Sequence, residues 1–191
     1  MNKLITLFAS VALLFSFSLA QADDDEKYQA TLNTFKDSPQ VSSFFGSAYG
    51  YALFPTIGKG GIGVGGAHGK GRVYAQGAHV GNTSMTQLSI GFQLGGQAFS
   101  EVIFFETKED FDKFTSGNFE FGAQASAVAI TASANAKVGT TGSGIGASGT
   151  SDKAGMQKAR YNDGMAVFTH AKGGLMYEAA LSGQKFKYEA L

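Results

Sequence analysis

The residues best suited to chemistry are four cations. Lys59, Lys70 and Arg72 lie in a glycine-rich stretch, and Lys172 lies far downstream. Residues 38–100 contain no Asp or Glu. Because cations without nearby anions are free to meet an anionic partner, this pattern favours a binding surface. Solvated surface charge is the ordinary alternative, and the missing counter-charge is what distinguishes these four residues as predicted ligand-binding residues.

The glycine pattern itself could indicate phosphate binding. Gly61-x-Gly63-x-x-Gly66 matches the dinucleotide fingerprint by letter. That fingerprint also needs a helix that begins within it and an acid about 20 residues later to hold the ribose. Here the sequence continues as glycine and strand, and the first acid is Glu101. We therefore reject nucleotide binding and expect the glycines to serve close backbone packing.

Other reactive constellations are missing from the sequence. His68, His79 and His170 are scattered, without the H-E-x-x-H spacing of a zinc site. There is no G-x-S-x-G nucleophile motif and no cysteine, which excludes disulfides and thiolate chemistry. We therefore expect a binding protein without catalytic residues, metal or cofactor, and not an enzyme.

Three helices are expected among the elements that position these residues. Apolar side chains at helical spacing in residues 28–35 predict the first. Ser38-Pro39 has the form of an N-cap followed by proline at the first helical position, which predicts a second, short helix. Thr107, followed by acids in the first turn, and Gly117 as a terminating residue delimit an internal helix.

The rest of the sequence predicts mainly β-strands. A strand over residues 51–57 is expected to leave its sheet near Pro55, because proline favours edges and exits. Residues 72–80 are expected to pair with residues 87–94 across a turn at Gly81–Ser84. The apolar run within Glu101–Phe105 predicts a central strand. Further strands are expected over residues 119–137, 165–170, 175–181 and 185–189.

The first 22 residues have the form of a signal peptide. Lys3 precedes an apolar stretch, Ala20-Gln21-Ala22 is an A-x-A cleavage site, and an acidic run follows from Asp23. The alternative, a membrane anchor, is disfavoured because the stretch is short for a spanning helix. We expect cleavage after Ala22 and a periplasmic or secreted protein.

This reading divides the chain into three parts. Residues 1–22 are the signal peptide, residues 23–48 a helical segment, and residues 49–191 a β-rich domain. Within that domain, residues 139–151 are low-complexity Gly, Ser and Thr and are expected to form a flexible loop. The whole chain carries 15 basic and 15 acidic side chains, yet none of the acids lies within residues 38–100, and a run of acids lies just before this window, from Asp23 to Asp37.

Five ordered blocks resemble the SYLF domain family. The first is Tyr51-Ala52-Leu53-Phe54-Pro55 with the Lys59–Gly66 and Gly69-Lys70-Gly71 segments that follow it. The later blocks are Ser89–Gln97, Val102–Phe105 with the acidic helix after it, Lys172–Met176, and Leu181-Ser182-Gly183. Together they extend the resemblance over roughly residues 35–189.

The resemblance implies a single α+β domain that is mostly β. It would consist of antiparallel strands with two N-terminal helices and one internal helix. It also implies binding to phosphoinositides or other anionic phospholipids at a membrane surface, here through Lys59, Lys70, Arg72 and Lys172. Lys70 departs from the family pattern, in which an acid commonly lies between the two glycines. No nucleic-acid partner is expected, and a protein partner stays open because a secreted chain would not meet the actin bound by fungal members.

A second interpretation is a small outer-membrane β-barrel or another structural envelope protein. The length and the glycine-rich strands suit eight strands. The expected helices and the lack of paired aromatic girdles count against it.

Overall fold

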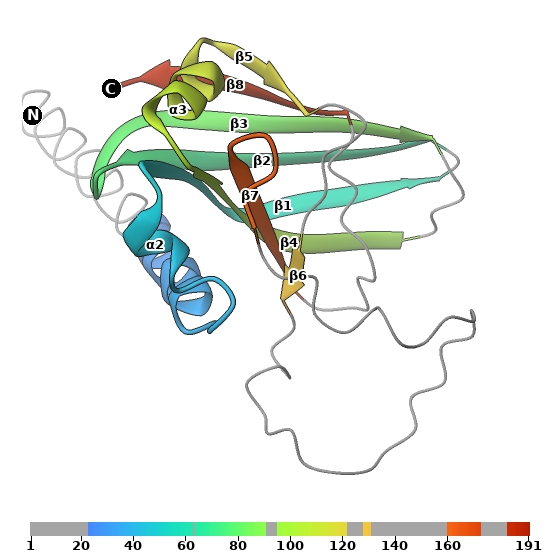
Figure 1. Cartoon of the computed structure of the whole chain (residues 1–191). Helices are drawn as coiled ribbons and strands as arrows, with labels where there is room; N and C mark the ends of the chain where they lie inside the picture. Colours follow the sequence, from blue (N-terminus) through green and yellow to red (C-terminus); the bar gives the residue numbers. More distant parts are fainter. Residues whose placement is uncertain (1–22, 63, 91–94, 122–127, 131–159, 173–182) are drawn as a thin grey trace, which may run out of the picture.

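The computed structural model describes residues 23–62, 64–90, 95–121, 128–130, 160–172 and 183–191. The described strands form one eight-stranded sheet in the order β5-β8-β3-β2-β1-β4-β7-β6 (Figure 1). Neighbouring strands in this part of the chain run antiparallel, apart from β6, which is parallel to β7. The α+β, mostly β fold expected from the sequence is confirmed.

The centre of the sheet consists of long strands that follow one another in the chain. Each central strand pairs with its sequence neighbour or with a strand close by, so short connections suffice. The strands are β1 (Gly50–Ile62), β2 (Val64–Ala75), β3 (Ala78–Ile90), β4 (Gly95–Phe105), β5 (Asn118–Glu120), β6 (Val128–Ile130), β7 (Met165–Ala171) and β8 (Gln184–Ala190).

Three helices accompany the sheet. The N-terminal helix is described over residues 23–36, as its apolar stripe predicted. The short helix α2 (Phe44–Ser47) begins later than expected, because hydrogen-bonded turns occupy the residues after Ser38. Helix α3 (Lys108–Thr115) has the predicted cap: the Thr107 hydroxyl accepts from the amide of Asp110, whose carboxylate accepts from the Thr107 amide.

Two expectations about the first strands are wrong. Pro55 does not end its strand; it lies inside β1, at an irregularity where the register shifts toward both neighbours. A bulge tolerates proline because the ladder is already interrupted there. The turn expected at Gly81–Ser84 is part of β3. The chain instead reverses at Gln76 and Gly77, which both adopt positive φ, as a two-residue hairpin loop requires.

Several further expectations fall outside the described residues. These are the signal peptide over 1–22, most of the strand expected over 119–137, the loop over 139–151 and the strand over 175–181. The strands expected near residues 165–170 and 185–189 are confirmed as β7 and β8.

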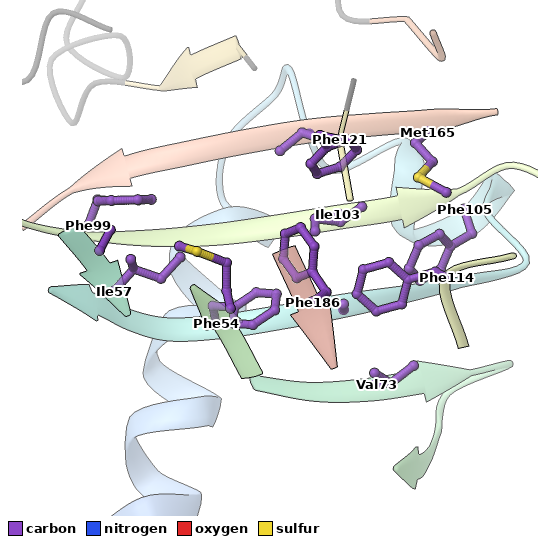
Figure 2. Close-up of a cluster of buried hydrophobic side chains, with 14 residues drawn as sticks. Phe54, Ile57, Val73, Phe99, Ile103, Phe105, Phe114, Phe121, Met165 and Phe186 are labelled. Atoms are coloured by element: carbon purple, nitrogen blue, oxygen red, sulfur yellow. The ribbon is translucent and has the colours of Figure 1, made fainter. Parts of the chain in front are cut away.

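The sheet buries apolar side chains on both faces. We call one the inner face; Figure 2 shows its side chains converging, with Phe54, Ile103, Phe114 and Phe186 at the centre. The opposite, outer face packs Leu53 and other residues against the N-terminal helix and α2. The outer cluster comprises Phe35, Val41, Phe44, Leu53, Val102, Phe104, Ala166 and Phe168.

The sheet curls around its inner face. The ring of Phe54 on β1 lies 5.6 Å from that of Phe186 on β8, although β2 and β3 separate these strands in the sheet. Gln184 on β8 likewise donates a hydrogen bond of 3.3 Å to Glu101 on β4. Neighbouring strands are about 4.8 Å apart in a flat sheet, so these contacts require strong curvature.

Two glycines of β2 make this close packing possible. A Cβ atom at Gly71 would lie 2.7 Å from the ring of Phe54, and one at Gly69 would lie 2.6 Å from Cγ1 of Ile57. Both distances are shorter than real Cβ contacts allow. Phe54 and Ile57 therefore occupy the space that side chains at these positions would fill, which confirms the expected packing role for these two glycines.

One titratable group is completely buried on the inner face. Burial raises the pKa of the Glu101 carboxyl to about 8, against a smaller lowering by the Gln184 hydrogen bond. Oε1 of Glu101 and Oε1 of Gln184 otherwise have no described hydrogen-bond partner. A protonated carboxyl can donate to the amide oxygen while it accepts from the amide nitrogen, which would satisfy both oxygens. We infer that Glu101 is protonated at neutral pH.

Filling the space above β2 should destabilise the domain. We expect Gly71→Ala to lower the free energy of unfolding by about 1–3 kcal/mol, because Phe54 must move or strain. Gly58→Ala is the control, since a Cβ there meets no described atom within 4 Å. Urea denaturation measures both, and equal stability of the two variants would contradict the packing argument.

The buried carboxyl should make stability depend on pH. Between pH 4.5, the ordinary pKa of a glutamate, and about pH 8, the folded protein holds the Glu101 proton whereas the unfolded chain releases it. The free energy of unfolding therefore falls as the pH rises through this window. Glu101→Gln keeps the shape and both hydrogen bonds without a titration. We expect it to flatten the decline and to be more stable than the unaltered protein at about pH 9. Denaturation at a series of pH values, with the exposed Glu106→Gln as control, tests this, and parallel curves for all three proteins would refute it.

Candidate functional site

A groove of about 900 Å³ lies on the outer face, where the start of the N-terminal helix crosses the sheet. We call it the outer groove. Most of its lining residues are charged or polar, including the hydroxyls of Thr56 and Ser84 and the Asn82 amide, and glycines contribute backbone. The charged lining residues are Asp24, Lys27, Lys70, Arg72, Lys187 and Glu189. The lining thus holds four cations and two carboxylates, and two of the cations, Lys27 and Arg72, also form ion pairs with Asp23 and Asp25.

The alternation of β2 determines which side chains reach this groove. Gly69 and Gly71 face the inner core, so His68, Lys70 and Arg72 between and beside them face outward. In β1 the pairing with β2 is irregular after Leu53 and resumes at Thr56, which lies opposite Lys70. Ser84 of β3 lies opposite Lys70 on the other side. Lys70 therefore has a hydroxyl residue next to it on each neighbouring strand.

Arg72 is held by two side chains of the N-terminal helix. Its Nη2 lies 2.6 Å from Oδ1 of Asp25, and its guanidinium carbon lies 4.1 Å from the centre of the Tyr28 ring. The Arg72 side chain is 17% exposed, whereas that of Asp25 is 56% exposed. The premise that the cations have no counter-charge is thus wrong for Arg72, because the N-terminal helix brings an acid from outside the acid-free window.

Two further cations complete the site. Lys187 projects from β8, which pairs with β3 so that Lys187 lies opposite Ser84. Lys27 comes from the helix and lies 2.6 Å from Asp23 and 3.9 Å from Asp24. Sequence reasoning missed both. The alternation of Lys185, Lys187 and Glu189 on the last strand was the available signal for an outward charged face.

Lys172 lies beside the groove. Its ammonium donates a hydrogen bond of 3.1 Å to the hydroxyl of Thr56, which lines the groove. Burial, followed by the positive charge of Lys27, lowers the pKa of Lys172. Lys172, which follows β7, and Lys27 on the helix thus both lie at the rim of the groove near Thr56.

Lys59 is the one predicted residue that lies elsewhere. It pairs with Ala67, which is buried in the inner core, and directly paired residues share a face of the sheet. His68, the next residue of β2, lines the outer groove on the opposite face. The structure therefore brings Lys70, Arg72 and Lys172 together and separates Lys59 from them.

The described residues offer little for other kinds of site. Within the ranges that the structure describes, no three His, Cys, Asp or Glu residues lie close enough to hold a metal ion. No helix in the same ranges is long and apolar enough to cross a membrane.

The sequence matches the model of the Ysc84 family, described as "Las17-binding protein actin regulator", over residues 86–189. That region includes β4, α3, β7 and β8 but not β1 or β2. The chain is also similar to Beta cell expansion factor A of Aeromonas veronii, with 27% identity over 168 residues. The match covers 82% of this chain and 52% of the relative, so the chain spans about half the length of that protein.

The family match extends over more than half of the chain and covers the later blocks found in the sequence, from Ser89 to Gly183. The chain belongs to the Ysc84 family, whose domain is the SYLF domain.

Proposed function

We propose that the protein binds the anionic headgroups of phospholipids at a membrane surface through the outer groove. The observation that carries this proposal is the convergence of Lys70, Arg72 and Lys187 with hydroxyl and amide groups in one open groove. Lysine and arginine attract phosphate, and hydroxyl and amide groups can hydrogen-bond its ester and polyol oxygens. Apart from Tyr28 and Pro55, the lining residues carry no large apolar side chain for acyl chains. The ligand we propose is therefore a headgroup, not a buried lipid tail.

The proposal includes no catalytic step. The groove residues supply charge and hydrogen bonds to a ligand, and the proposal assigns none of them as a nucleophile or a base. With the leader-like residues 1–22, we further propose that binding takes place in the periplasm or outside the cell.

The family description names a protein partner, Las17. Protein interfaces usually centre on buried aromatic and aliphatic anchors. The charged and hydroxyl lining of the outer groove favours a phosphate-bearing partner over such an interface.

Vesicle flotation tests the proposed function. We expect the protein to float with phosphatidylglycerol vesicles and to stay unbound with phosphatidylcholine vesicles. Each lysine near an anionic surface contributes about 1 kcal/mol, so Lys70→Ser combined with Lys187→Ser should weaken binding by roughly 30-fold. Equal binding to both kinds of vesicle would refute recognition of anionic lipid.

The matched control is Lys59→Ser, compared with Lys70→Ser alone. Both change one lysine of the same glycine-rich stretch, but the two residues lie on opposite faces of the sheet. We expect Lys70→Ser to weaken binding about fivefold and Lys59→Ser to change it less than about twofold. The reverse order would place the site on the inner face. Competition by free glycerol phosphate at millimolar concentration distinguishes a soluble phosphate ligand from a membrane surface.

A further inference from the structure

Two side chains at the beginning of the N-terminal helix contact Arg72 in the outer groove. Asp25 forms the ion pair with Arg72, and Tyr28, one turn later, places its ring over the same guanidinium. Asp24 also lines the groove. The Asp25 carboxylate thus occupies the position beside Arg72 that a phosphate oxygen of a ligand would take.

The two ends of this helix are attached to the sheet differently. Thr31 and Phe35 are buried, and Phe35 belongs to the outer cluster. Residues 23–27 are exposed, and of the first two turns only Tyr28 is half-buried. The later turns are anchored by apolar packing, whereas the acidic first turn depends on contacts with Arg72. Such a segment can separate from the sheet while the rest of the helix stays in place.

We propose that Asp25 is an internal competitor for the anion subsite at Arg72. This inference rests on the proposed headgroup binding. Arg72 is held between β2 and Tyr28 and is mostly buried, while Asp25 is the exposed partner that can leave. An incoming phosphate replaces the carboxylate, so the guanidinium keeps a negative partner throughout. The apparent affinity for the ligand is then proportional to the fraction of molecules in which Asp25 has left Arg72.

The charge balance agrees with competition. Asp25 neutralises the cation nearest the helix and Asp24 adds a second negative charge at the groove, while Lys70 and Lys187 have no described ion pair. An exposed ion pair is weak and is screened by salt. The competition is therefore modest, and a membrane dense in anionic lipid overcomes it more readily than an isolated phosphate does.

The experiment compares Asp25→Asn with Glu26→Gln in the purified protein. Both remove one negative charge from exposed, adjacent positions of the same helix, but only Asp25 pairs with Arg72. Binding to phosphatidylglycerol vesicles is measured for both variants and the unaltered protein. We expect Asp25→Asn to bind about three- to tenfold more tightly, and Glu26→Gln to stay within about twofold of the unaltered protein.

The outcomes separate this inference from the proposed function. If the unaltered protein prefers anionic vesicles and neither variant changes the affinity, Asp25 does not compete and headgroup binding stands. An equal gain in both variants also overturns the inference, because net charge alone would explain it. If none of the three proteins distinguishes anionic from neutral vesicles, headgroup binding itself fails. Circular dichroism verifies that both variants keep their helix content.

Discussion

The packing of Phe54 and Ile57 into the space above Gly71 and Gly69 is the constraint on which the rest of the structure depends. Side chains on β2 at these positions would hold β1 and the interior away from the strand. Because both positions are glycine, the sheet curls tightly enough for Phe54 to contact Phe186 three strands away. The same curvature brings Glu101 to Gln184 and buries the carboxyl, which raises its pKa.

The inward glycines also organise the outer face. Because successive residues of a strand point to opposite sides, inward glycines at 69 and 71 leave Lys70 and Arg72 pointing outward. These two cations therefore line the groove, where Arg72 pairs with Asp25 and Lys70 has no described ion pair. One alternating sequence thus serves two functions, close packing inside and charge outside.

Much of the fold was predictable where the signal is local. The capping residues Thr107 and Asp110 determine the start of α3, and the apolar run of β4 identifies a central strand. The prediction of a turn at Gly81–Ser84 was wrong. Turn-forming residue types do not exclude a strand when neighbouring strands supply hydrogen bonds on both sides. Pro55 was misplaced for a related reason, since a bulge is visible only when both partner strands are known.

The sequence by itself determined the family, the β-rich class and the cationic, glycine-rich character of the segment that carries the site. Only the tertiary structure decided which cations act together. Register in β1 places Lys59 on the face opposite Lys70, since a shift of one residue reverses the direction of every side chain. The docking of the N-terminal helix decides that Arg72 has an acidic partner, because a contact between residues so far apart in the chain depends on packing that no local pattern encodes.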